Sequence, residues 1–172
     1  MKKQVVIING SAGVGKDTFV AICNSFCKVM NYSSIDEIKR LAKLIGWDGI
    51  KNESGRKLLS DLKAAMSEYC DLPFQSMKNK YNEFIKSDAD ILFLHIREPE
   101  EIAKAANEFN AITLIIKNKN VKQIVSNMGD ANVYDFNYDV VIDNSRTLND
   151  LKNTAKWFID ILKRDGEQMN DK

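Results

Sequence analysis

Features that would assign this chain to several common protein classes are scarce or absent. The sequence has a single histidine, His95, and only three cysteines, an odd number. No metal-ligand pattern accompanies the cysteines, so we expect reduced, buried thiols in a cytosolic protein. No apolar run approaches the roughly 20 residues that span a bilayer, so we expect no membrane partner.

Neither sign of charge is in excess. Lysine and arginine number 25, aspartate and glutamate number 24, and the formal net charge is +1. Proteins that bind nucleic acid or anionic membranes usually carry a basic surplus, so we expect neither partner. The first apolar stretch runs only from Val5 to Ile8, which is too short for a signal peptide, and we expect a cytoplasmic protein.

Apolar residues recur with periods that alternate between those of strands and those of helices. Short apolar runs predict strands at residues 5–8, 31–35, 91–94, 112–116 and 140–142. Apolar faces predict helices from Phe19 to Met30 and at residues 38–45, 58–69, 74–85, 99–109 and 147–162. A capping box of Thr147 and Asp150 would start the last helix, and a polar tail would follow from residue 165.

Strands that alternate with helices imply an α/β fold, a five-stranded parallel sheet flanked by helices on both faces. No repeat or linker divides the chain, so we expect one domain over residues 1–172. A polar stretch precedes the last strand, at residues 117–139. It carries one weak helical stripe of Val121, Ile124, Val125 and Met128.

The strongest motif is a glycine-rich loop between the first strand and the first helix. It consists of Gly10, Ser11, Ala12, Gly13, Val14, Gly15, Lys16, Asp17 and Thr18, and it matches the G-x-x-x-x-G-K core of the P-loop. Its glycines let the backbone N–H groups point at phosphates, and the helix that follows adds the positive end of its dipole. Lys16 supplies a point charge that reaches the outer phosphates. The loop therefore predicts a site for a nucleoside triphosphate.

Asp17 is the one departure from the P-loop pattern, which has a serine or threonine at this position. That hydroxyl normally binds Mg²⁺. A carboxylate is also a good magnesium ligand, so we predict that Asp17 binds the metal, with the Thr18 hydroxyl next to it. The alternative is that Asp17 only complements the positive end of the helix.

The rest of the sequence favours a small-molecule kinase over other P-loop proteins. A GTPase would carry Asn-Lys-x-Asp after a late strand, but residues 118–121 read Asn-Lys-Asn-Val, without the carboxylate that pairs with guanine. Motors and helicases need a longer chain and an acidic residue after the second core strand, where this chain has His95. A compact domain with helical inserts suits a small kinase.

The run Gly15-Lys16-Asp17-Thr18 resembles the loop of phage-type deoxynucleoside monophosphate kinases and animal-type phosphomevalonate kinases. Residues 33–39, 94–97 and 139–144 also resemble segments of that family, and residues 45–63 are similar to small kinase-like proteins of phages and bacteria. The resemblance implies a P-loop NTPase fold of the nucleoside-monophosphate-kinase type. It implies a substrate-binding helical insert at about residues 36–88 and a lid at about residues 117–138. It also implies transfer of the γ-phosphoryl group of ATP, with Mg²⁺, to a small phosphorylated acceptor, most readily a (deoxy)nucleoside monophosphate.

Arg97 is the strongest candidate for an acceptor-side catalytic residue. It follows a central strand, and ligands of open parallel sheets bind beyond the carboxyl ends of the strands. We predict that it binds a phosphate or the transition state, and that Lys16 and Arg97 together are catalytic. The alternative is an ion pair with one of the acidic residues nearby, Glu98, Glu100 and Glu101.

Five further residues are candidates for substrate or base contacts. His95 would contact substrate, or be a histidine satisfied by backbone. Asp36 would bind a substrate hydroxyl or a metal, or be a helix N-cap. Arg40 and Arg56 lie in the expected insert, where they would bind the acceptor, although a solvent-exposed arginine explains Arg56 as well. Asn144 would lie beside the nucleotide base, or belong to an ordinary turn.

The expected lid is poor in arginine. Lys117, Lys119 and Lys122 can neutralise charge there, but lysine lacks the bidentate fork of arginine. Together with His95, this lid leaves a second function open, a nucleotide-binding regulatory module with little or no catalysis. The sequence also leaves open whether the protein forms a homodimer.

Overall fold

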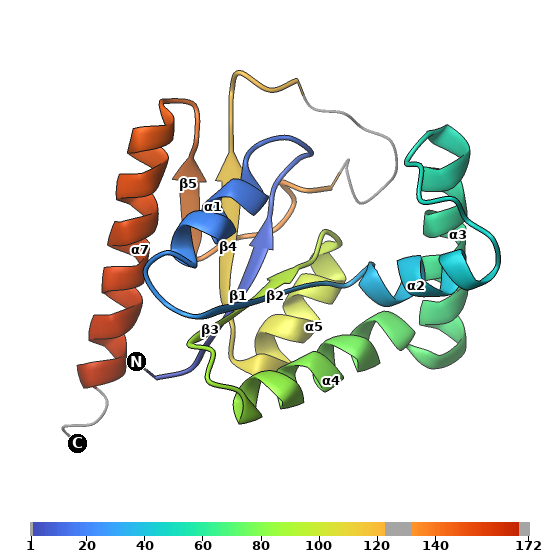
Figure 1. Ribbon diagram of the computed structural model, residues 1–172, viewed down its shortest axis with the longest axis horizontal. Coiled ribbons are helices and arrows are strands. Elements are labelled where there is room, and N and C mark those ends of the chain that lie inside the picture. The colour runs from blue at the N-terminus through green and yellow to red at the C-terminus, as the bar shows by residue number, and fades with distance from the viewer. Residues whose placement is uncertain (1, 123–131, 169–172) are drawn as a thin grey trace.

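Five parallel strands form the centre of the molecule (Figure 1). A computed structural model describes residues 2–122 and 132–168 of the chain. The strands are β1 (Gln4–Asn9), β2 (Val29–Ser33), β3 (Ile91–His95), β4 (Ile112–Lys117) and β5 (Val140–Asp143). Their order across the sheet is β2-β3-β1-β4-β5, and every neighbouring pair is parallel. The five-stranded parallel sheet predicted from the sequence is therefore confirmed.

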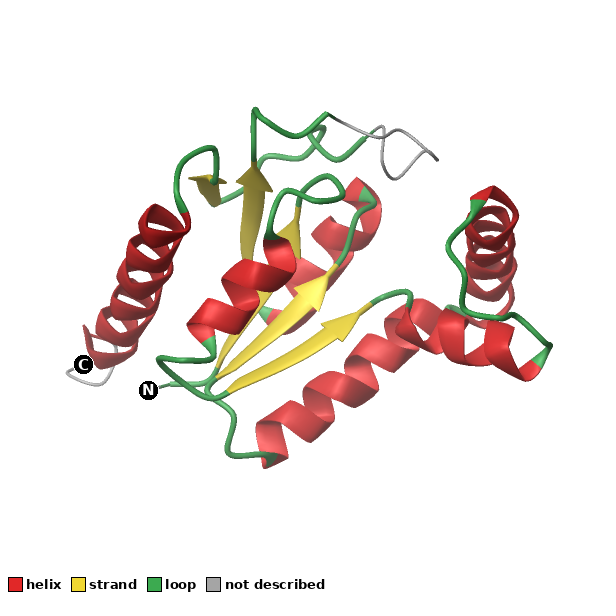
Figure 2. Ribbon diagram, turned by 45° about the horizontal axis from the view of Figure 1, so that its top comes forward, coloured by secondary structure: helices red, strands yellow, loops and turns green. Residues whose placement is uncertain are grey.

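Helices cover both faces of the sheet (Figure 2). They are α1 (Lys16–Cys23), α2 (Asp36–Leu44), α3 (Glu53–Cys70), α4 (Leu72–Lys86), α5 (Pro99–Phe109) and α7 (Leu148–Gln168). Helices α1 and α7 pack on one face, and α4 and α5 pack on the other. The side chains of the strands alternate between the two layers, so Val6 and Ile8 face α1 and α7 while Val5 and Ile7 face α4 and α5.

Helices α2 and α3 form a smaller unit beside the sheet (Figure 1). Ile38 and Ala42 of α2 pack on Leu59 of α3 in a hydrophobic cluster of their own. Helix α4, which the sequence placed in the same insert, instead contributes Phe74 and Met77 to the layer beneath the sheet. The part of the chain that stands apart from the main core is thus α2 and α3.

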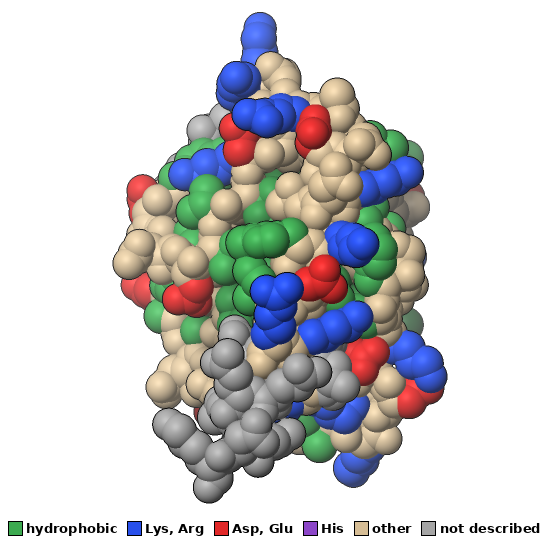
Figure 3. Space-filling view, turned by 90° about the vertical axis from the view of Figure 1, so that its left-hand side faces the viewer, with side chains coloured by type: hydrophobic (Ala, Val, Ile, Leu, Met, Phe, Trp, Pro, Cys, Tyr) green, Lys and Arg blue, Asp and Glu red, His purple; other side chains and the backbone are tan. Residues whose placement is uncertain are grey.

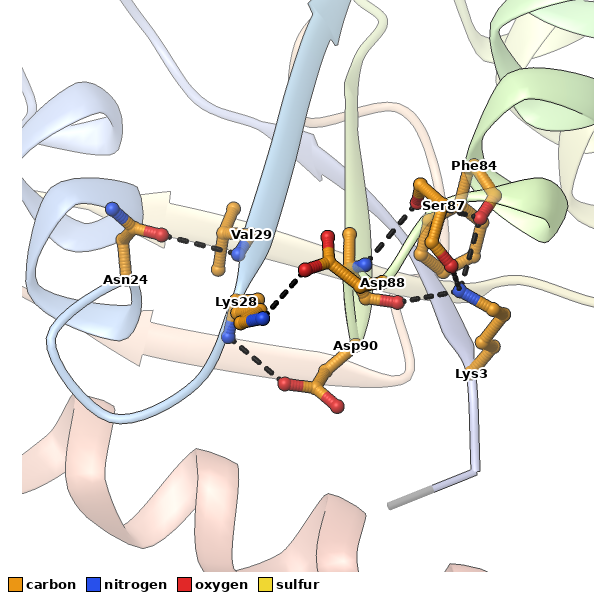
Figure 4. Close-up of polar contacts among 9 residues, drawn as sticks. Lys3, Asn24, Lys28, Val29, Phe84, Ser87, Asp88 and Asp90 are labelled. Atoms are coloured by element: carbon orange, nitrogen blue, oxygen red, sulfur yellow. Dashed lines mark hydrogen bonds and ion pairs between the residues drawn. The ribbon is translucent and has the colours of Figure 1, made fainter.

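The amino ends of β1, β2 and β3 are joined by polar contacts (Figure 4). The Lys3 ammonium donates to the carbonyl oxygens of Phe84, Ser87 and Ala89, at 3.0, 2.8 and 2.7 Å. The Lys28 N–H donates to the Asp90 carboxylate at 2.9 Å. These contacts hold the edge of the sheet that lies opposite the glycine-rich loop.

The face that carries α7 mixes charged side chains of both signs with exposed hydrophobic ones (Figure 3). Trp157 and Leu148 of α7 are about half exposed, at 54% and 56%. None of the helices within residues 2–122 and 132–168 combines the length and apolar character needed to cross a membrane.

Several element boundaries differ from the sequence-based prediction, and α3 begins at Glu53, five residues earlier than predicted. Helix α1 ends at Cys23, where the Asn24 N–H bonds the Val20 carbonyl, so Met30 belongs to β2 and not to the helix. Strand β2 accordingly lies two residues earlier than predicted, at Val29–Ser33. Helix α7 continues to Gln168, into the predicted polar tail.

The predicted start of the last helix is confirmed. The Asp150 N–H donates to the Thr147 hydroxyl, and the Asp150 carboxylate accepts from the Thr147 N–H in return. Three residues of the predicted helical stripe, Ile124, Val125 and Met128, lie outside the described residues, as does the central part of the predicted lid.

Candidate nucleotide-binding site

The glycine-rich loop connects the carboxyl end of β1 to the amino end of α1. Gly10, Gly13 and Gly15 have φ angles of 141°, 79° and 99°, a region that L side chains rarely adopt. A Cβ at Gly10 would lie 2.4 Å from the Ile116 carbonyl oxygen, and one at Gly15 would lie 2.4 Å from Nδ2 of Asn144. Gly10 is required both by its φ angle and by the nearby backbone oxygen. Gly15 is required by its φ angle, and a side chain there would also displace the Asn144 amide. The predicted loop therefore lies at the N-terminus of α1 with a backbone that favours glycine at three positions, as a phosphate cradle there would require.

Lys16 lies across this loop. Its ammonium donates to the carbonyl oxygens of Gly10 at 2.6 Å and of Ser11 at 2.9 Å. The charge is thereby held at the loop by backbone carbonyl oxygens. The position is the one expected of a lysine that neutralises the outer phosphates.

Asp17 and Thr18 occupy the first turn of α1, and both are exposed. Their carboxylate and hydroxyl oxygens are ligands that Mg²⁺ accepts. Within residues 2–122 and 132–168, no three histidine, cysteine or acidic side chains gather as a metal cage. The donor set therefore fits a magnesium ion that takes one or two ligands from the protein and the rest from phosphates and water.

His95 ends β3 and pairs in register with Ile8 of β1 and with Ser33 of β2. Its Nε2 lies 2.8 Å from Oδ1 of Asn31. An amide oxygen can only accept, so Nε2 carries the proton. Burial lowers the pKa of His95; of the nearest charges, Asp17 acts against this lowering and Lys16 adds to it. The imidazole is thus neutral at pH 7, and it lies close to the first turn of α1.

Arg97 follows β3 by two residues and is half-buried. Two of the acidic residues near it in the sequence, Glu98 and Glu101, accept from the ammonium of Lys63, at 2.7 and 2.9 Å. Lys63 comes from α3, so these carboxylates join α5 to the unit of α2 and α3. The backbone carbonyl of Arg97 accepts from the side chain of Asn9 at 3.2 Å.

Asp36 is the first residue of α2, and Ile35 is the N-cap of that helix. The alternative that Asp36 is the N-cap is therefore wrong. Its carboxylate instead accepts from the Ser33 N–H at 2.9 Å and from the Lys39 ammonium at 2.8 Å. The carboxylate thereby fixes the bend between the end of β2 and α2, on the same edge of the sheet as the loop.

Arg40 and Arg56 lie on the surface of the unit formed by α2 and α3. Arg40 donates to the Glu37 carboxylate, with Nε at 2.8 Å. Arg56 donates from Nε to the Lys51 carbonyl at 3.1 Å. Both side chains are exposed and bonded close to their own position in the chain. Their role in substrate binding stays a prediction.

Asn144 contacts the glycine-rich loop directly. Its Nδ2 donates to the Val14 carbonyl at 2.8 Å, and its backbone N–H donates to the Lys117 carbonyl at 2.7 Å. The adjacent Ser145 hydroxyl accepts from the Lys119 N–H at 2.9 Å. The segments that follow β4 and β5 are therefore joined to each other. Asn144 also joins them to the glycine-rich loop at Val14, close to the start of α1.

Sequence reasoning missed two residues of this site, Asn9 and Tyr138. Asn9 is only 1% exposed, and its side chain bonds the loop, the Arg97 backbone and the Tyr138 hydroxyl. In the sequence, Asn9 resembled a simple strand terminator before Gly10. The one available signal in the sequence was an asparagine directly after an apolar run. An amide at the end of a buried strand is expected to be buried as well, and it then needs several hydrogen-bond partners.

No protein-family model and no curated protein matches the sequence. Among solved structures, the chain is similar to TT1252 from Thermus thermophilus, with a TM-score of 0.54, 16% identity, and 94% of this chain and 99% of that chain covered. It is similar to the tunicamycin resistance protein of Deinococcus radiodurans, with a TM-score of 0.55, 12% identity and coverages of 94% and 96%. It is also similar to a Chloroflexus aurantiacus protein proposed to be a kinase. The TM-score is 0.53 and the identity 10%, with 95% of this chain and 97% of that chain covered.

These similarities concern the fold. They confirm the predicted α/β fold with its parallel sheet and flanking helices. The fold and the loop together define a P-loop protein. The resemblance to phage-type deoxynucleoside monophosphate kinases stays a prediction.

Proposed function

We propose that this protein is a kinase that transfers the γ-phosphoryl group of ATP to a small phosphorylated acceptor, most readily a (deoxy)nucleoside monophosphate. The observation that carries the proposal is the edge formed by the carboxyl ends of β1 and β3. It brings a glycine-dependent phosphate cradle, Lys16 and Asp17 to the same edge as His95 and Arg97. The similarity to a protein proposed to be a kinase supports the same reading.

Some residues of the site would bind ATP, the phosphoryl donor, and others the molecule that accepts the phosphoryl group. Lys16 exchanges its two carbonyl acceptors for oxygens of the outer phosphates, and the loop N–H groups hold the rest of the triphosphate. Asp17 would hold Mg²⁺, which supplies charge neutralisation of the phosphates when bound. Arg97 neutralises the charge that lies between donor and acceptor, and its planar fork orients that charge.

A phosphate acceptor makes a general base unnecessary, so the reaction does not depend on proton transfer to His95. An oxygen of the acceptor phosphate forms the new bond to the γ-phosphorus, and the bond to the bridging oxygen of ADP breaks. The second pKa of a phosphate monoester is about 6, so that oxygen is already ionised at pH 7 and needs no general base. The chemistry asks for positioning and positive charge, which the loop, Lys16 and Arg97 supply.

The test is ATP consumption with a panel of ribo- and deoxyribonucleoside monophosphates, with ADP and the new diphosphate both measured. Lys16→Ala should abolish transfer and weaken triphosphate binding. Arg97→Ala should lower turnover at least about tenfold, since charge-assisted bonds are worth about 1.5–3 kcal/mol, and ATP affinity should change far less. Arg97→Lys should recover only part of the loss, because a point charge cannot reproduce the fork.

Arg164→Ala is a matched control, because Arg164 is exposed on α7. It should turn over like the parent protein. If Arg97→Ala keeps normal turnover with a lowered thermal midpoint, Arg97 has a structural role only. If the parent binds ATP and phosphorylates none of the acceptors, the regulatory nucleotide-binding module is the better function.

A further inference from the structure

The side chain of Asn9 joins three segments that are far apart in the sequence. Its Oδ1 accepts from the Gly10 N–H at 2.8 Å, at the start of the glycine-rich loop. Its Nδ2 donates to the Arg97 carbonyl at 3.2 Å and to the Tyr138 hydroxyl at 2.7 Å. The Tyr138 hydroxyl in turn donates to the Val133 carbonyl at 2.9 Å.

Chemistry allows only one orientation of this amide. A backbone N–H can only donate and a backbone carbonyl can only accept, so Gly10 requires Oδ1 and Arg97 requires Nδ2. The second N–H of Nδ2 then meets the Tyr138 oxygen, which remains free to donate onward to Val133. One acceptor and two donors are therefore all used, and the group is buried at 1% exposure. Of the side chains of this size, only asparagine offers that set.

The three partners have different places in the proposed reaction. Gly10 begins the loop that would hold the donor phosphates, and its backbone lies so close to the Ile116 carbonyl of β4 that no side chain fits there. Arg97 is the proposed acceptor-side cation. Tyr138 belongs to residues 132–138, whose Tyr134 hydroxyl lies 3.1 Å from the Ser11 hydroxyl of the same loop. Burial raises the pKa of Tyr138, so its hydroxyl stays protonated at neutral pH.

We propose that Asn9 is a positioning residue that sets the distance between the donor loop and Arg97 and joins both to residues 132–138 through Tyr138. This inference rests on the function proposed above, because it assigns Arg97 to the acceptor side. Asn9 does not touch the reacting atoms. It acts through the backbone on either side of them, where a displacement of about 1 Å can cost about a hundredfold in rate.

The sharpest variant is Asn9→Asp, which keeps the shape and the acceptor for Gly10 N–H but replaces both donors with an oxygen. The contact to the Arg97 carbonyl is then lost, because both atoms can only accept. The Tyr138 hydroxyl keeps a contact only by donating to the carboxylate in place of Val133, while the loop keeps its anchor. Tyr138→Phe is a milder variant that removes only the hydroxyl. Thr113→Val is the matched control, because Thr113 is also buried, at 3% exposure. Its hydroxyl bonds Asp139, the residue after Tyr138, at 2.7 Å, so this variant disturbs the same segment without removing a bond of Asn9.

The experiment follows the Arg97 Nε–H signal by NMR in protein with ¹⁵N-labelled arginine, assigned by its loss in Arg97→Lys. The probe is the non-hydrolysable analogue AMPPNP with Mg²⁺. In the parent, binding of the analogue at the loop should shift the Arg97 signal. In Asn9→Asp, the shift at saturating analogue should fall by at least about half, and the added carboxylate beside the loop should also weaken binding of the analogue. In Tyr138→Phe, which adds no charge, the shift should also fall, while the Kd should stay within about threefold, less than the value of one hydrogen bond.

Turnover of the best monophosphate acceptor is the second readout. It should fall at least about tenfold in Asn9→Asp and less in Tyr138→Phe, with Thr113→Val near the parent. Thermal midpoints are measured on all four proteins, and Thr113→Val should lose stability without losing the Arg97 response. If Asn9→Asp does not fold, Tyr138→Phe carries the test through its Arg97 response.

Two results would overturn the inference. One is an Arg97 signal in the parent that does not respond to the analogue. The other is a pair of variants, Asn9→Asp and Tyr138→Phe, that lose thermal stability but keep the parent response and turnover. A parent that binds the analogue and shows the response but phosphorylates no acceptor contradicts the proposed kinase function, while the NMR comparison still decides the role of Asn9.

Discussion

Asp17 is the residue at which the glycine-rich loop departs from the usual P-loop pattern. It is exposed in the first turn of α1, beside an exposed Thr18. Its negative charge also raises the pKa of His95, against the larger effect of burial, so the carboxylate lies close to the end of β3. An oxygen ligand at this place can bind Mg²⁺, and it can also complement the positive end of the helix.

Asp17→Asn should separate these two roles. If the carboxylate binds the metal, this variant should need about tenfold more Mg²⁺ for half-maximal turnover, because an amide oxygen is a weaker ligand for a hard cation. Thr18→Val should change the magnesium requirement less. The measurement is a magnesium titration of turnover, together with calorimetry of AMPPNP binding at each magnesium concentration. The reverse ranking of the two variants would assign the metal to Thr18.

Single elements are held in place by polar groups at the edge of the sheet opposite the site (Figure 4). Lys3 precedes β1, and it donates to the carbonyls of Phe84, Ser87 and Ala89 at and just beyond the end of α4. The carbonyl end of a helix carries partial negative charge, so an ammonium there satisfies acceptors and stabilises the dipole. The ammonium also lies 4.7 Å from the centre of the Phe84 ring.

Lys3→Met should therefore lower the free energy of unfolding by about 1.5–3 kcal/mol, the range for hydrogen bonds to a charged group. Urea denaturation measures this loss. Lys2→Met, at the exposed neighbouring position, should change stability by less than about 0.5 kcal/mol. The Kd for AMPPNP should stay at the parent value in both variants, because the loop lies at the other edge of the sheet. A matching loss of AMPPNP affinity in Lys3→Met would contradict this separation.

At the scale of the whole molecule, the unit of α2 and α3 is attached to the main core by charged groups. Lys63 of α3 has a side chain only 13% exposed and binds both Glu98 and Glu101. Burial raises the pKa of Glu101 to about 7; Lys63 acts against this rise, and repulsion from Glu98 adds to it. Burial would also raise the pKa of Glu98, but the attraction of Lys63 outweighs it and lowers that pKa.

This pair makes stability depend on pH in a defined direction. A carboxyl whose pKa is raised by folding binds more protons in the folded state, so Glu101 should reduce stability as the pH rises from 4.5 to about 7. Glu98 stays ionised in this window and does not oppose the trend. The loss should be about 1–2 kcal/mol, after allowance for the partial exposure of the side chain.

Glu101→Gln should remove most of this pH dependence. Thermal or urea unfolding at several pH values between about 5 and 8 measures it, and above pH 7 the variant should be at least as stable as the parent. Glu100→Gln is the matched control, since Glu100 is exposed in the same turn of α5, and it should follow the parent. An unchanged pH profile in Glu101→Gln would mean that Glu101 is ionised in the folded protein throughout this range.

Local patterns were sufficient for much of the fold. The apolar runs at residues 5–8, 91–94 and 112–116 lie in strands because such runs can be buried on both faces, and this requirement is visible in the sequence itself. The glycine spacing of the loop and the Thr147–Asp150 cap are equally local. The end of α1 at Cys23 was not predictable in the same way, because Cys27 and Met30 continue the apolar period.

Only the tertiary structure decided the contacts between residues that are far apart in the chain. Asn9 meets Tyr138 across 129 positions, and Asn144 meets Val14 across 130. Lys63 binds Glu98 across 35 positions. No periodicity or motif encodes such pairs, because they depend on how strands order in the sheet and where each strand ends. The sequence by itself determined that a glycine-rich loop with the spacing of a P-loop joins β1 to α1, and the packing of the sheet determined which distant residues contact that loop.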